Sequence, residues 1–188
     1  MTIVKQLRDP LWMLHAESRQ LSPGDIRKWK AKLAGLDNGR KFFLGWDFAA
    51  TFPDKYPKGA SVPGGTGLDA LTVTINTIGT DGVSIKLGGL PNGYAGKVGD
   101  MISISYGGSP PTQLALLQAV EDFSAGGSGV STQFEVRAAI PAGVSVGDAV
   151  KLHKPSCHMM ISPGSISAPK DSTARGTITF DAIQVPTI

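Results

Sequence analysis

The stretch Thr72-Val-Thr-Ile-Asn-Thr-Ile78 decides the fold class, because apolar and polar residues alternate along it. The pair Asp81-Gly82 follows, and the alternation then resumes over residues 83–87. A period of two places one set of side chains on one face of a strand, and Asp-Gly is a common turn between paired strands. The stretch therefore predicts a β-hairpin, with a bulge at Ile78 where the alternation slips.

Further strands are predicted after this hairpin, separated by turn signals such as Asn92-Gly93 and Pro163-Gly164. The predicted strands span residues 101–106, 112–121, 132–139, 148–154, 157–162 and 176–185. Their spacing near ten residues is typical of a β-sandwich or a small barrel. Glycine usage agrees, since 20 of the 24 glycines follow residue 58. We predict a mainly β (α+β) fold: a β-sandwich or small barrel with one crossing α-helix near the N-terminus.

The tripeptide Val-Gly-Asp occurs twice, at residues 98–100 and 146–148, each time before an apolar strand start. In small barrels such a tripeptide forms a turn at the rim. Glycine there adopts a positive φ, and the aspartate accepts hydrogen bonds from nearby backbone N–H groups. The repeat predicts β architecture and carries no functional information.

A single helix is predicted over residues 23–36. Ser22 can cap it, Pro23 suits its first position, and Asp25 faces the positive end of the helix dipole. Apolar residues follow at helical spacing and predict one buried stripe made of Ile26, Trp29, Leu33 and Leu36.

The aromatic stretch 41–48 after the helix predicts a strand. Residues 11–16 fit either a helix or a strand, and we favour a strand that pairs with 41–48 once the helix has crossed over. Three prolines and a Gly-rich cluster between residues 49 and 69 predict a long connection that reaches a neighbouring subunit.

Charge and composition divide the chain near residue 58. Residues 1–58 hold 11 Lys and Arg against 6 Asp and Glu (+5), while residues 59–188 hold 7 against 9 (−2). We therefore describe an N-terminal strand-helix-strand part (1–58), a Gly/Pro-rich connection (59–69) and a β-rich part (70–188), packed as one structural unit. One cysteine in the chain gives no disulfide framework, and the charged N-terminal ten residues do not resemble a signal peptide.

No residue set predicts catalysis, a cofactor or a metal site. His153, Cys157 and His158 lie within six residues and superficially resemble a metal site or a Cys-His pair. A strand over 157–162 would turn Cys157 and His158 to opposite faces, and a fourth zinc ligand, from His15 or a carboxylate, has no recognisable spacing. We interpret Cys157 as a buried small hydrophobe.

The basic residues of the predicted helix are a candidate binding surface, made of Arg27, Lys28, Lys30 and Lys32. Such a surface can bind nucleic acid phosphates, but no nucleic-acid-reading motif accompanies it. We favour a solvated face or a subunit interface with an acidic partner, and expect no sequence-specific nucleic-acid binding and no membrane insertion.

The order of motifs resembles a known family. A short apolar segment precedes SPGDIRKWKAKLAGLDNGRKFFLGWD (22–47), and GLPNGYAGKVGDMISI (89–104) is followed by a second Gly-Asp strand start. From Trp12 to Val185 the chain resembles the small tail-tip virion proteins of tailed bacteriophages and gene transfer agents, and is most similar to distal tail proteins.

The resemblance implies a structural, non-enzymatic role in the virion tail. It implies a hexameric homo-oligomeric ring, assembled in the host bacterial cytoplasm, that joins the tail tube to the hub and other baseplate proteins. The residues alone also favour an assembly subunit, because a β-rich chain has strand edges to pair. Four alternatives remain: a tail-tube subunit, a tail-terminator subunit, a carbohydrate-binding β-sandwich that would use Trp12 and Trp46, and an enzyme with a site at His153, Cys157 and His158.

Overall fold

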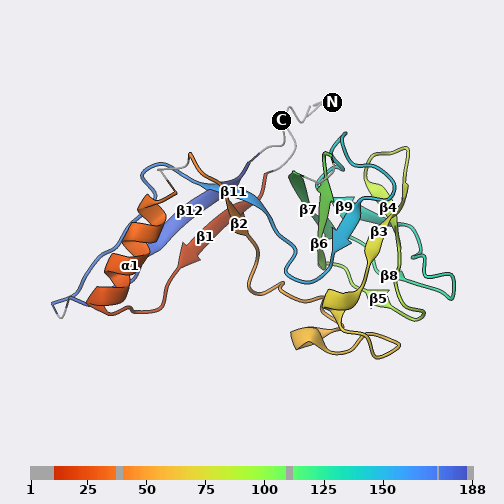
Figure 1. The fold of residues 1–188 in the computed structure, drawn as a ribbon, viewed down its shortest axis with the longest axis horizontal. Coiled ribbons are helices and arrows are strands. Elements are labelled where there is room, and N and C mark those ends of the chain that lie inside the picture. The colour runs from red at the N-terminus through yellow and green to blue at the C-terminus, as the bar shows by residue number, and fades with distance from the viewer. Residues whose placement is uncertain (1–10, 37–39, 109–111, 173, 186–188) are drawn as a thin grey trace, which may run out of the picture. The chain divides into compact units, whose positions relative to one another are not determined.

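A computed structural model describes residues 11–36, 40–108, 112–172 and 174–185. The chain forms two compact units: residues 46–157, here the barrel unit, and residues 11–45 with 158–185, here the sheet unit (Figure 1). Over the described residues the fold is mainly β with one α-helix, as predicted. The structural boundaries near residues 45 and 157 differ from the compositional boundary at residue 58, because the C-terminal strands join the N-terminal ones in the sheet unit.

The barrel unit contains a closed barrel in the strand order β10-β3-β4-β9-β7-β6. Its strands are β3 (Val73–Ile78), β4 (Ser84–Gly88), β6 (Met101–Tyr106), β7 (Gln113–Ala119), β9 (Phe134–Arg137) and β10 (Ala149–Lys151). The predicted hairpin is therefore β3–β4, and closure removes its open edges. The bulge lies between Ile75 and Thr77 rather than at Ile78.

The barrel core includes a series of stacked aromatic rings. Tyr56 stacks on Tyr94 at 4.9 Å between ring centroids, and Phe123 stacks on Phe134 at 4.0 Å with 11° between the rings. The two-residue strands β5 (Ala95–Gly96) and β8 (Phe123–Ser124) pair beside them. Strands this short carry no alternation, so sequence periodicity missed both.

The connection between residues 49 and 69 packs on its own barrel. It contains two short 3₁₀ turns, Pro57–Gly59 and Leu68–Ala70, and Tyr56, Val62 and Leu68 are buried in the barrel core. The prolines do interrupt regular structure here, as expected. The buried side chains anchor the connection to its own barrel, and its reach to a neighbouring subunit stays a prediction.

The sheet unit is an open four-stranded sheet in the order β1-β12-β11-β2. Its strands are β1 (Met13–Glu17), β2 (Phe43–Gly45), β11 (Cys157–Ile161) and β12 (Thr179–Gln184). Residues 11–16 do contribute a strand, but its predicted pairing with 41–48 is wrong. β1 pairs with β12, and β2 lies at the other edge beside β11, because α1 carries the chain across the sheet before β2 begins.

Helix α1 (Pro23–Ala34) begins as the sequence predicts and ends two residues before the predicted end. The Ser22 hydroxyl accepts a hydrogen bond from the Asp25 N–H at 3.2 Å, which satisfies one of the unpaired donors of the first turn. Ile26 and Leu33 are buried and pack against Ile161 and Ile178, so one side of the helix covers one face of the sheet.

Candidate functional site: exposed surfaces of the two units

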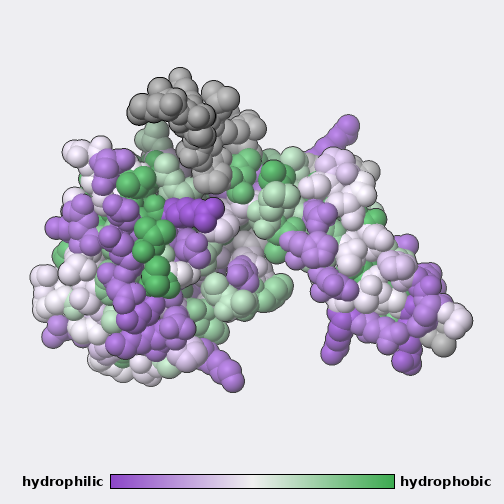
Figure 2. All heavy atoms as spheres, turned by 180° about the vertical axis from the view of Figure 1, so that it is seen from behind, coloured by the Kyte–Doolittle hydropathy of each residue, from purple (hydrophilic) through white to green (hydrophobic). Residues whose placement is uncertain are grey.

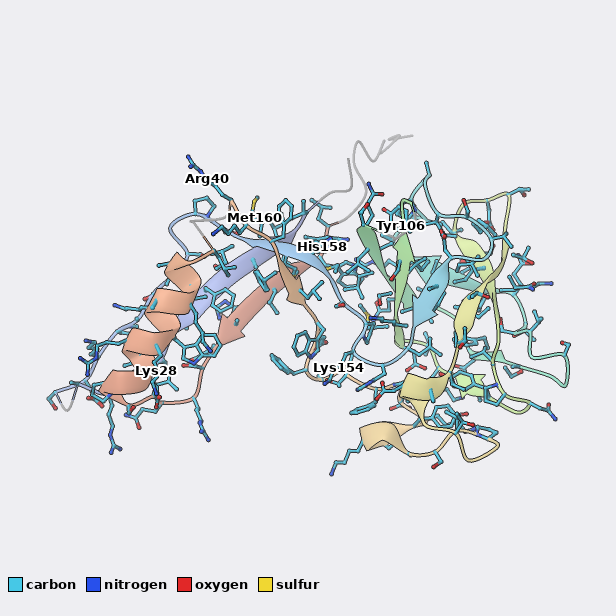
Figure 3. All side chains as sticks on the ribbon, in the orientation of Figure 1. Lys28, Arg40, Tyr106, Lys154, His158 and Met160 are labelled. Carbon is cyan, nitrogen blue, oxygen red and sulfur yellow. The ribbon has the colours of Figure 1, made fainter. Side chains whose placement is uncertain are left out.

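The basic surface predicted from the sequence lies on the outer side of α1. Arg27, Lys28, Lys30 and Lys32 are all exposed. Lys28 Nζ lies 3.6 Å from Asp25 Oδ1, and Lys28 is labelled on the helix in Figure 3. Exposed ion pairs of this kind contribute little to stability, so these side chains are available to a partner.

Trp29 does not belong to the buried stripe, and that prediction is wrong. Its side chain is 42% exposed, and Lys32 Nζ lies 5.6 Å from its ring centroid. The helix contacts the sheet along a narrow line through Ile26 and Leu33. Trp29 follows Ile26 by three residues and is rotated about 60° to one side of it. Lys28 and Lys32 lie on the same flank of α1 as Trp29, whereas Arg27 and Lys30 lie on the opposite flank of the buried line.

The charge asymmetry persists when it is counted by structural unit. The sheet unit holds 9 Lys and Arg against 5 Asp and Glu (+4), and residues 46–157 hold 7 against 9 (−2). Arg40, which is also exposed, extends away from the ribbon in Figure 3. The two units thus present surfaces of opposite net charge.

Exposed apolar side chains lie on both edge strands of the sheet unit. Met13 on β1 is 75% exposed, and Leu44 on β2 is 51% exposed. Phe42, directly before β2, is 56% exposed and its ring centroid lies 6.3 Å from that of His158. Edge strands of soluble proteins usually carry charged residues or prolines instead, because an apolar edge pairs with other chains. Sequence reasoning missed this feature because periodicity does not reveal which strands form the edges.

Hydrophobic side chains also reach the surface of the barrel unit. Val98, Val120 and Val146 are 61%, 40% and 64% exposed, and Phe48 is 78% exposed. Figure 2 shows a narrow strip of hydrophobic side chains on one face of this unit, within an otherwise mostly hydrophilic surface. Apolar groups gathered on a surface mark contact sites more often than apolar groups that occur singly.

The structure does not bring His153, Cys157 and His158 together as a site. His153 stacks on Phe52 at 4.6 Å between ring centroids, and its Nδ1 hydrogen-bonds to Asp69. Cys157 is fully buried, and burial raises the pKa of its thiol to about 12, so it is not a ready nucleophile. His158 alternates with Cys157 along β11 and is half-buried.

The remaining histidine, His15, is committed to a different contact. Its Nδ1 lies 2.6 Å from Asp181 Oδ1, directly across the β1–β12 pair. Within the described residues, no three or more His, Cys, Asp or Glu side chains are arranged to hold a metal ion. Nor does any described helix have the length and apolar character needed to span a membrane.

Both Val-Gly-Asp tripeptides form the predicted turns. Gly99 and Gly147 have φ values of 96° and 95°. Asp100 accepts a hydrogen bond from the Lys97 N–H, and Asp148 accepts one from the Ser145 N–H. Asp100 also accepts a hydrogen bond from the Asp54 N–H at 2.8 Å, which ties the connection to the barrel.

Asp100 and Asp122 are expected to titrate on opposite sides of the ordinary aspartate pKa. Burial raises the pKa of Asp100, whereas the hydrogen bond from Lys97 lowers the pKa of Asp122. As pH falls through the raised pKa of Asp100, protonation of this carboxyl stabilises the folded protein. As pH falls through the lowered pKa of Asp122, protonation of that carboxyl destabilises the folded protein. An NMR titration of the side-chain carboxyl carbons should give a higher midpoint for Asp100. Equal midpoints, or the reverse order, would contradict this assignment.

Comparison with known proteins finds no family model and no curated protein that matches the chain.

Proposed function

We propose that this chain is a structural virion protein that forms a ring at the distal end of a phage tail and joins the tail tube to the baseplate hub. The motif order described above supports the proposal at the level of the sequence. At the level of the structure, the support comes from the two edges of the open sheet and from the basic surface of α1.

The observation that carries the proposal is the open sheet of the sheet unit. β1 and β2 are its two edges, and each bears exposed apolar residues, Met13 on β1 and Leu44 on β2. An edge strand offers a row of backbone N–H and C=O groups to a further strand. One copy with two different open edges can continue its sheet into two neighbours. This arrangement favours a ring or another closed assembly over a monomer.

The basic surface of α1 is the second candidate contact. We assign Arg27, Lys28, Lys30 and Lys32 to a subunit interface, because an assembly built from unlike patches on each copy can use opposite charges to fix orientation. In this proposal the sheet edges supply backbone pairing and the helix supplies electrostatic specificity.

A charge placed on the β2 edge is expected to abolish the assembly. Leu44→Lys replaces a half-exposed edge residue, so the isolated fold should tolerate it while pairing with another strand becomes unfavourable. Val146→Lys is the matched control, since Val146 is 64% exposed in a barrel-unit turn.

Light scattering coupled to size-exclusion chromatography measures the outcome. The Leu44→Lys protein should elute as a folded monomer, and the Val146→Lys protein should retain the mass of the wild-type assembly. An unchanged oligomer in Leu44→Lys would rule out the sheet edge as the assembly contact. Binding of a monomeric wild-type protein to surface polysaccharide would instead favour the carbohydrate-binding alternative.

A further inference from the structure

We propose that the basic outer side of α1 in one copy docks on an acidic corner of the barrel unit of the next copy. The acidic corner is defined by Val98, Val120, Glu121, Asp122 and Glu135. The inference rests on the proposed function, because it names the contact that would join neighbouring copies in the ring.

Hydrogen bonds hold the acidic corner together from three segments of the barrel. The Glu135 N–H donates to Glu121 Oε2 at 3.1 Å, and the Val98 N–H donates to Asp122 Oδ1 at 2.9 Å. The Val120 N–H donates to the Glu135 carbonyl at 3.0 Å. The corner is therefore built on strand ends and a rim turn of the closed barrel, and the hydrogen bonds position the carboxylates of Glu121 and Asp122 before a partner arrives.

The corner carries more negative charge than its own cations neutralise. Lys97 Nζ binds Asp122 at 2.6 Å and is thereby committed. Glu121 and Glu135 are exposed neighbours, and no ion pair within 4.0 Å reaches either of them from any described residue. Arg137 lies two residues beyond Glu135 on the same outward side of β9. An incoming cation can therefore pair with these exposed carboxylates.

The outer side of α1 matches this corner in both charge and apolar character. Arg27 and Lys30 lie three residues apart on an exposed flank, so their side chains are neighbours. Val98 and Val120 of the corner are exposed apolar side chains. The aliphatic parts of the Arg27 and Lys30 side chains can pack on these two valines while their charged groups reach the carboxylates.

The contact joins unlike surfaces, and this determines the kind of assembly it makes. The helix belongs to the sheet unit and the corner belongs to the barrel unit, so each copy carries one of each. Head-to-tail contacts of this type generate rings when the rotation closes. The same chain supplies both members of the charge pair, which favours a second copy over a nucleic acid as the occupant of the basic surface.

Charge reversal on each surface tests the pairing. One variant carries Arg27→Glu and Lys30→Glu, and the other carries Glu121→Lys and Glu135→Lys. Either variant alone places like charges in every contact and should fail to assemble. When the two variants are mixed, each contact again joins opposite charges, so assembly should return with alternating copies. Lys55→Glu with Lys151→Glu is the control for net charge, and it should assemble like the wild type.

The outcomes separate this inference from the proposed function. Light scattering on the mixture should recover the wild-type mass, and higher salt should weaken the recovered assembly. If each variant assembles alone, or if the mixture of folded variants stays monomeric, the pairing is wrong while a wild-type ring would still stand. Loss of Glu121 also removes a backbone contact, so Glu135→Lys alone provides a second acidic-corner variant with an intact fold.

A nucleic acid is the competing occupant of the basic surface. Fluorescence anisotropy with a labelled oligonucleotide compares the wild type with the Arg27→Glu, Lys30→Glu variant. The two proteins should show the same oligonucleotide binding. Binding that only this variant loses, together with unimpaired assembly of both variants, would overturn the inference. A monomeric wild-type chain would instead remove the proposed function itself.

Discussion

Phe134→Ala should lower the free energy of unfolding of the barrel unit by about 3–5 kcal/mol, the range for removing a buried aromatic side chain. Phe134 is 1% exposed, and its ring lies 4.0 Å from that of Phe123. The substitution leaves a cavity beside a closed barrel that cannot collapse easily, and it also removes a stacking contact. Urea denaturation followed by near-ultraviolet circular dichroism measures the change.

Phe48→Ala is the matched control for this prediction. Phe48 is 78% exposed, and its ring contacts Trp46 at 5.3 Å. Surface substitutions of this kind usually change stability by less than about 0.5 kcal/mol. Equal losses in the two variants would show that Phe134 is not part of a packed core, and would contradict the barrel described above.

Gly89→Ala should destabilise the barrel unit by about 3 kcal/mol or more, since a strained backbone and overpacking each cost roughly 1–3 kcal/mol. Gly89 has a φ of 80°, a backbone conformation that residues other than glycine rarely adopt. A Cβ at this position would also collide with the Thr72 carbonyl oxygen. That carbonyl belongs to the backbone beside β3, so the clash cannot be relieved by a rotamer change.

Gly82→Ala separates the two causes. Gly82 has φ of 69°, and no atom lies within 4 Å of the position that its Cβ would occupy. The free energy of unfolding of this variant should fall only by the cost of the left-handed backbone conformation, about 1–2 kcal/mol. Thermal unfolding of both variants gives the difference, which isolates the collision at Thr72. If Gly82→Ala were the more damaging of the two, the close approach at residue 89 would be disproved.

Much of the barrel is predictable from the sequence because its strands alternate cleanly. The hairpin of residues 72–87 and both Val-Gly-Asp turns follow from local chemistry, and local chemistry does not depend on the rest of the chain. Strand partners are different. The pairing of β1 with β12 joins residues near the two ends of the chain, and no local pattern specifies such a partner.

The surfaces proposed to form the assembly contacts were only partly predictable. The basic residues of α1 are visible in the sequence, whereas the exposure of Trp29 depends on how narrow the contact between helix and sheet is. Likewise, Glu121 and Glu135 are 14 residues apart, and the β7–β9 pairing that brings them together is a tertiary feature. Sequence reasoning therefore found one member of the proposed charge pair and missed the other.

The mass and shape of the purified wild-type protein distinguish an assembly subunit from a monomer. Light scattering combined with negative-stain imaging should show a closed ring with a central hole and a mass that is a multiple of the 19.6 kDa chain. A compact monomer of 19.6 kDa at concentrations typical of purified protein would contradict the proposed assembly.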